Sequence, residues 1–200
     1  MDGVVHRSRR LILQEGFGLR VVSASVATFP PELGWSGPSS TREEDRESWL
    51  PARVVWGTDP ALHYEEDLLS DFAYVTSVGS DPEQVAAVAR LAEQRLPVRS
   101  VGQLLEDVDW QFGDEDRAHA VVRAGAGAPL EVHEGVLDCV RAALAHASPQ
   151  VRMAAVWAVT YQPWPEFRTL LRERAETETD EHVTAVIRHL LDGWDPVGEK

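Results

Sequence analysis

Residues 148–159 of this 200-residue chain have the sequence SPQVRMAAVWAV, in which a Ser-Pro turn precedes a run of small and apolar residues. The apolar positions recur three, four and seven residues apart, as they do along one face of a helix. They are Val151, Ala154, Ala155 and Ala158. The segment therefore predicts a helix that is opened by its turn and presents a face of small side chains.

Similar helix-opening turns recur along the chain at almost constant spacing. They stand at Asp81-Pro82, Asp114-Glu115, Ser148-Pro149 and Asp180-Glu181, which are 33, 34 and 32 residues apart. Each unit has a second half, in which Leu104, Leu137 and Leu170 repeat at intervals of 33 residues. Repetition at this length is typical of stacked helical units, because no single unit can bury its apolar face alone.

Both halves of each unit have helical rather than strand periodicity. The apolar patterns predict helices over Val85–Ala92, Val101–Val108, Val132–Leu144, Val151–Ala158, Phe167–Leu171 and Val183–Leu191. The repeat of about 33 residues does not extend to residues before Asp81. There we expect one more helix, over Pro60–Ser77 with Asp59 as its N-cap, which would cover the end of the stack. The expected fold class is mainly α, a solenoid of helical repeats.

The N-terminal region has the composition of short strands and loops. Leu19–Phe29 and Ala52–Trp56 are predicted to be short extended segments, because they are rich in Val, Ser and Thr. The Pro- and Gly-rich residues between them predict a loop, followed by a short charged helix over Thr41–Trp49. We therefore divide the chain into an irregular region, residues 1–58, and helical repeats, residues 59–200.

The segment Ser148–Val159, with its Pro turn, its Val-Arg pair and its small-residue face, resembles the first helix of a HEAT-like repeat. Asp81–Val88 and Asp180–Leu191 are weaker copies. The resemblance covers about residues 81–193, although Ser148 stands where such repeats usually have Asp. It implies an α-solenoid and, by analogy, a role in protein interaction, and it transfers no catalytic residue.

The charge balance narrows the classes of partner. The chain has 33 Asp and Glu against 19 Lys and Arg, a formal net charge of -14, which would repel the phosphates of a nucleic acid. No apolar run approaches the roughly 20 residues of a membrane span, and the single Cys139 cannot close an intramolecular disulfide. Eighteen Arg against one Lys are typical of a GC-rich bacterial genome. We therefore expect a bacterial, cytoplasmic protein that binds neither nucleic acid nor membrane.

An acidic run is the first candidate for partner binding. It lies within residues 106–116, lacks a basic residue and contains six acids, Glu106, Asp107, Asp109, Asp114, Glu115 and Asp116. It does not fit a calcium loop, because Phe112 stands where the EF-hand motif needs Gly and Ala118 where it needs a bidentate Glu. The run is either a solvated loop between helices or an anionic docking surface.

Two tryptophans are the second candidate. Trp157 follows the small-residue face, and Trp164 lies in a Pro163-Trp164-Pro165 corner. Tryptophan is a common anchor at protein interfaces, but both side chains could instead fill space between helices.

The seven histidines have no zinc-binding spacing, and Cys139 lies among apolar residues of a predicted helix. Because neither the histidines nor Cys139 form a recognisable metal or nucleophile site, we expect no metal, no cofactor and no catalytic residue.

These observations favour a non-enzymatic module that binds another protein. One specific form is an acidic immunity or inhibitor protein, because a small acidic domain associates rapidly with a basic target through electrostatic steering. Two alternatives stay open. One is a structural adaptor in a larger assembly, and the other is an enzyme of the HEAT-like DNA glycosylase kind, which would need a basic groove. The sequence does not set the oligomeric state.

Overall fold

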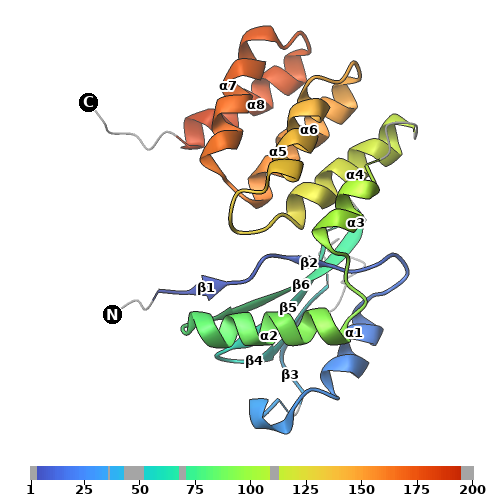
Figure 1. The fold of residues 1–200 in the computed structure, drawn as a ribbon, viewed down its shortest axis with the longest axis vertical. Coiled ribbons are helices and arrows are strands. Elements are labelled where there is room, and N and C mark those ends of the chain that lie inside the picture. Colours follow the sequence, from blue (N-terminus) through green and yellow to red (C-terminus); the bar gives the residue numbers. More distant parts are fainter. Residues whose placement is uncertain (1–3, 36, 43–51, 68–70, 109–112, 195–200) are drawn as a thin grey trace. The chain divides into compact units, whose positions relative to one another are not determined.

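The computed structural model describes residues 4–35, 37–42, 52–67, 71–108 and 113–194. The chain divides into two compact units, Met1–Ser100 and Val101–Lys200. In the described residues, the first unit contains a six-stranded antiparallel sheet with helices, and the second is built from helices (Figure 1). The expected mainly α solenoid is therefore wrong, because the fold mixes helices with a sheet.

The sheet of the first unit runs in the order β1, β6, β5, β4, β3, and β2 also pairs with β6. The strands are β1 (His6–Arg7), β2 (Leu11–Ile12), β3 (Pro38–Arg42), β4 (Arg53–Gly57), β5 (Ala61–Asp67) and β6 (Phe72–Gly79). All pairs are antiparallel. Gly57 pairs with Ala61, so the three residues between them close a hairpin.

One face of the sheet packs with two helices, α1 (Leu19–Val26) and α2 (Pro82–Arg95), to form the core of the first unit. Every second strand residue points to this face, as side chains of a pleated strand must. The shared core includes Val22 and Val26 of α1, Val88 and Ala92 of α2, Val54 and Trp56 of β4, and Leu62 and Tyr64 of β5. A short 3-10 helix, η1 (Pro31–Leu33), follows α1.

The predicted helix over Pro60–Ser77 is wrong, because this segment contains β5 and most of β6. Leu62 and Tyr64 are fully buried, whereas His63 between them is only partly buried and points to the opposite face. The hydrogen bonds to β4 and β6 decide the conformation. A short apolar pattern cannot reveal such long-range partners, and so it misled the assignment.

The predicted extended segment Leu19–Phe29 is also wrong, because it contains α1. Its β-branched residues favour strands locally, but Val22 and Val26 lie four residues apart and bury together in the core. The extended prediction for Ala52–Trp56 is confirmed by β4. Most of the predicted helix Thr41–Trp49 lies outside the described residues, and its first two residues belong to β3.

Helix α2 begins where the first repeat unit predicts it. The carboxylate of Asp81 caps it by accepting hydrogen bonds from the N–H groups of Glu83 and Gln84. Its buried stripe packs within the first unit, next to β6. The first predicted repeat is therefore part of a helix-on-sheet layer, and residue 58, the predicted boundary, lies in the hairpin between β4 and β5. The division into compact units falls at residue 100.

The second unit confirms the helices predicted from the apolar spacing as local elements. They are α3 (Val101–Glu106), α5 (Glu134–Leu144), α6 (Pro149–Tyr161), α7 (Pro165–Thr177) and α8 (Glu181–Trp194). A further helix, α4 (Asp114–Ala126), begins at the predicted Asp114-Glu115 turn. Helix α6 packs between α4 and α8, and α5 packs against α4, α6 and α7. Among the described residues, no helix combines the length and the apolar character that crossing a membrane would require.

Helices α4 and α6 run in the same direction. Near their starts, the guanidinium of Arg117 lies 2.9 Å from Nε2 of His146. Near their ends, the Cα hydrogens of Gly125 face Ala158, so closely that a Cβ on Gly125 would lie 2.5 Å from that of Ala158. At the starts of α6 and α8, Arg152 binds Glu178, which comes three residues before α8. The first turns of α4, α6 and α8 therefore lie toward one edge of the second unit.

Candidate protein-interaction surface

The acidic run places most of its side chains in solvent. Glu106 is the last residue of α3, and Asp114, Glu115 and Asp116 form the first turn of α4. These four residues are exposed, whereas Asp107 is half-buried. Asp109 lies outside the described residues. Acids in a first turn are favourable because the helix dipole is positive there, so the local fold tolerates this concentration of charge.

Arg117, the basic residue that follows the run, pairs with Asp114 and does not stand at the surface beside Glu115 and Asp116. Its side chain is buried in the second unit, with 6% of the residue exposed. Its guanidinium lies 3.2 Å from a carboxylate oxygen of Asp114 and next to His146. The carboxylates of Glu115 and Asp116 therefore face solvent without an exposed arginine beside them in the first turn of α4.

A second arginine is buried at the start of α6. Arg152 donates two hydrogen bonds, of 2.8 and 2.7 Å, to the carboxylate of Glu178 and others to the carbonyl oxygens of His146 and Ala147. Arg174 donates a further one to Glu178. The bond from Arg152, with that from Arg174, holds the pKa of Glu178 well below its usual range despite burial of the carboxylate. This cluster links α6 and α7 to the loops that precede α6 and α8, and its role is to hold these elements together.

The two candidate tryptophans differ in exposure. Trp157 of α6 is 44% exposed, whereas Trp164 is 4% exposed. The ring of Trp164 stacks on Phe167, with 4.8 Å between centroids, and its Nε1 donates a hydrogen bond to the carbonyl oxygen of Leu130. Trp164 thus fills space between helices, as the second interpretation of the sequence had it. Only Trp157 of this pair presents its ring to solvent.

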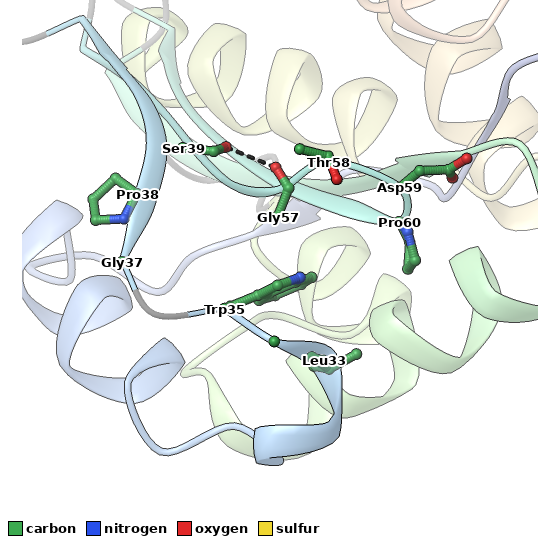
Figure 2. A pocket seen from close by; sticks show the side chains of 10 residues that line it. Leu33, Trp35, Gly37, Pro38, Ser39, Gly57, Thr58, Asp59 and Pro60 are labelled. Atoms are coloured by element: carbon green, nitrogen blue, oxygen red, sulfur yellow. Dashed lines mark hydrogen bonds between the residues drawn. The ribbon is translucent and has the colours of Figure 1, made fainter.

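The first unit contains a surface hollow that the sequence did not indicate. Figure 2 shows this hollow, of about 500 Å³, beside the hairpin between β4 and β5. Trp35 lies across Gly57, whose φ of +77° suits glycine, and a Cβ there would lie 2.2 Å from the indole Nε1. Ser39 donates a hydrogen bond to the Gly57 carbonyl oxygen. The Gly and Pro residues clustered in the sequence around Trp35 indicated a loop, but they did not indicate the hollow that this loop helps to form.

Asp59 lines the hollow, but its carboxylate does not point into it. In Figure 2 its carboxylate points away from Trp35. It accepts hydrogen bonds from the hydroxyl and the backbone N–H of Ser80, and these bonds lower its pKa. The predicted role of Asp59 as the cap of a helix at Pro60 is therefore replaced by a link between the β4–β5 hairpin and the residue that precedes Asp81. The hollow holds no acid or base aimed into it from the lining residues.

A polar network crosses the sheet face opposite α1 and α2. Tyr74 donates a 2.7 Å hydrogen bond to Glu65, which pairs with Arg53 at 3.2 Å. Arg53 also lies 3.3 Å from Nδ1 of His63. Burial, and next the charge of Arg53, lower the pKa of His63, and burial raises the pKa of Tyr74 to about 12. The network ties β4, β5 and β6 together, and the sequence missed it because this segment was assigned to a helix.

Other reactive groups are few. Within the described residues, no three His, Cys, Asp or Glu side chains are arranged to hold a metal ion. Cys139 of α5 is partly buried, and burial raises the pKa of its thiol to about 11, so the thiol stays protonated at neutral pH.

Comparison of the chain with protein-family models, curated proteins and solved structures found no match.

Proposed function

We propose that this chain is a non-enzymatic module whose helical second unit binds another, basic protein. The observation that carries the proposal is the first turn of α4, where Glu115 and Asp116 are exposed while the neighbouring Arg117 is buried. Residues 101–200 contain 18 Asp and Glu against 9 Arg and Lys, and the burial of Arg117 and Arg152 leaves still fewer cations at the surface. Such a field attracts a basic partner and repels nucleic acid.

Trp157 supplies the second requirement of a binding surface. Electrostatic attraction mainly raises the association rate, whereas a buried aromatic anchor slows dissociation. An exposed tryptophan on a helix packed on both sides can supply that anchor, because its backbone is already rigid. The likeness of Ser148–Val159 to a HEAT-like repeat supports a binding role by analogy.

An immunity or inhibitor protein that acts in the bacterial cytoplasm is the specific form we propose, with a basic protein as its target. The chain has a single cysteine and therefore no intrachain disulfide, which agrees with a reducing compartment. A structural adaptor would use the same surface but would stay bound within a permanent assembly.

The experiment compares two variants of equal net charge. The test variant carries Glu106→Gln, Glu115→Gln and Asp116→Asn, which leaves the Asp114–Arg117 pair intact. The control variant carries Glu134→Gln, Glu173→Gln and Glu176→Gln, three exposed acids of α5 and α7. A partner captured from the native host by the wild-type chain is then measured for its association rate with each protein at low and high salt.

We expect the test variant to associate about tenfold more slowly than the control at low salt, and the difference to disappear at high salt, where exposed charges are screened. Circular dichroism of both variants verifies that the helices are retained. Equal association rates at low salt would show that the acids of α3 and α4 are only solvated and would refute the steering role.

A further inference from the structure

Three chain segments form the hollow beside the β4–β5 hairpin, and all three belong to the first unit. They are residues 33–35 at the end of η1, residues 37–39 at the start of β3 and residues 57–60 in the hairpin. The volume of the hollow, about 500 Å³, falls within the range of sites that hold small molecules. The hollow is therefore large enough for a ligand of that size.

The walls of the hollow are held in place by contacts within the first unit. The ring of Trp35 packs with Phe29, with 6.1 Å between the ring centroids, and its indole lies against Gly57. Ser39 ties β3 to β4 through its 2.7 Å hydrogen bond to the carbonyl oxygen of Gly57. Because these walls exist before a ligand arrives, binding would require little ordering of the protein.

The lining of the hollow is unsuited to a charged ligand. The described residues that line it include no Lys, Arg or His. Asp59 is their only acid, and its carboxylate is bound to Ser80 and points away from Trp35. A phosphate or carboxylate would lose hydration here without gaining a cation, and a cation would gain no counter-charge. The lining therefore favours a neutral ligand.

Polar groups nevertheless line the hollow. In Figure 2 the hydroxyl of Thr58 points to the side of the hairpin on which Trp35 lies. Within the described parts of the chain, no residue forms a hydrogen bond with that hydroxyl or with Nε1 of Trp35. The backbone of Gly37 is open at the rim, because a Cβ there would meet no atom within 4 Å. The hollow thus combines the apolar surface of an indole with groups that donate and accept hydrogen bonds.

We propose that this hollow binds a neutral saccharide. The C–H groups on one side of a sugar ring pack against the partly exposed indole of Trp35. The hydroxyl groups of the sugar pair with the hydroxyl of Thr58, with the indole N–H and with the backbone at the rim. Because the site belongs to the first unit, this inference does not depend on the proposed binding of a basic protein by the second.

Other neutral ligands match the lining less well. A wholly apolar ligand would displace water and leave the hydroxyl of Thr58 and the N–H of Trp35 without partners, which costs free energy. A proline-rich segment can pack its rings on a tryptophan, but its prolines have no N–H to donate. A saccharide has both an apolar side and hydroxyl groups that donate and accept, so it can satisfy all of these groups.

The probes are the neutral disaccharides maltose, cellobiose, lactose and diacetylchitobiose, and their binding to the full chain is measured by saturation-transfer NMR and calorimetry. Trp35→Ala removes the indole, and Thr58→Val replaces the hydroxyl with a methyl group at an exposed position. Trp194→Ala and Thr177→Val are the matched controls, at a partly exposed tryptophan and an exposed threonine of the second unit.

We expect at least one of these disaccharides to bind. Trp35→Ala should weaken this binding about tenfold and Thr58→Val about fivefold, whereas each control should change it less than about twofold. Circular dichroism and urea unfolding verify the fold of each variant, and if Trp35→Ala does not fold, Thr58→Val decides. Failure of all the disaccharides to bind, or binding that Thr58→Val leaves unchanged, would overturn the inference.

Two further probes test the chemistry assigned to the ligand. Glucose 6-phosphate should bind no more tightly than glucose, because the lining supplies no cation. Tighter binding of the phosphorylated sugar would refute the preference for a neutral ligand. Decaproline should not bind, and binding of decaproline that Trp35→Ala abolishes would show that the hollow takes a peptide instead.

Discussion

Gly125 of α4 shows how a single hydrogen atom sets the spacing of two helices. A Cβ at this position would lie 2.7 Å from the carbonyl oxygen of Ala158 and 2.8 Å from its Cα. These are backbone atoms of a packed helix, which cannot move aside without separating α4 from α6. The small residues of both helices are therefore required by the close approach of their backbones.

Gly125→Ala should lower the free energy of unfolding by about 1–3 kcal/mol, because overpacking at the contact outweighs the better helix propensity of alanine. Gly193→Ala is the matched control, since it lies in α8 with no atom within 4 Å of the added Cβ. It should leave stability unchanged or raise it by up to about 1 kcal/mol. Urea unfolding of both variants measures the difference, and a stabilised Gly125→Ala protein would contradict the packing described here.

Glu178 makes stability depend on pH in the acidic range. Its pKa in the folded chain is lowered from the ordinary 4.5, chiefly by the hydrogen bonds from Arg152. A lowered pKa means that the stabilisation is present above about pH 4.5 and is lost as pH falls toward the folded pKa. The side chain of Glu178 is fully enclosed and that of Arg152 is nearly so, and protonation of Glu178 therefore leaves a buried guanidinium without its counter-charge.

Glu178→Gln should cost about 3–5 kcal/mol at neutral pH, because it leaves Arg152 buried without its counter-charge. The difference from wild type should shrink as the pH is lowered below 4.5. Glu176→Gln, at an exposed position of α7, should cost less than about 1 kcal/mol. Urea unfolding at a series of pH values tests this, and a Glu178→Gln deficit that does not change with pH would refute the role of the carboxylate.

At the scale of elements, β5 alternates between the core and the opposite sheet face. Leu62 is fully buried among the residues of α1, α2 and β4, whereas His63 contacts Arg53 on the other face. Leu62→Ala should therefore lower the free energy of unfolding by about 2–5 kcal/mol, and His63→Ala by less than about 1 kcal/mol. Equal losses, measured by urea unfolding, would be inconsistent with this strand and its pairing.

At the scale of the whole molecule, the division at residue 100 has a direct consequence. Each unit has its own buried side chains, such as Leu62 and Tyr64 in the first and Val121 and Phe167 in the second. A fragment of residues 101–200 should therefore fold alone, with a helical circular dichroism spectrum and a cooperative thermal transition. A fragment of residues 59–200 should instead aggregate or lose structure in its first 40 residues, because it separates β5 from β4. A non-cooperative transition for residues 101–200 would show that the helices need the first unit.

The candidate surface could be predicted in part. The Asp114-Glu115 turn correctly opens α4, so the acids of that turn were placed at a helix start from sequence. Trp157 was placed on a helix, but the burial of Trp164 depends on the ring of Phe167 and the carbonyl oxygen of Leu130, which both contact it. The burial of Arg117 beside His146, 29 residues away, could not be read from a local pattern.

The sequence by itself determined where α2, α4, α6 and α8 begin, because Asp, Ser and Pro at those turns and four-residue apolar spacing act within a few residues. It also determined the acidic character of the second unit. The tertiary structure alone decided that β5 and β6 pair as strands, that α1 is a helix, and that α2 packs with a sheet. These outcomes depend on hydrogen bonds and apolar contacts between distant segments, whose free energy outweighs the small local preferences of each segment.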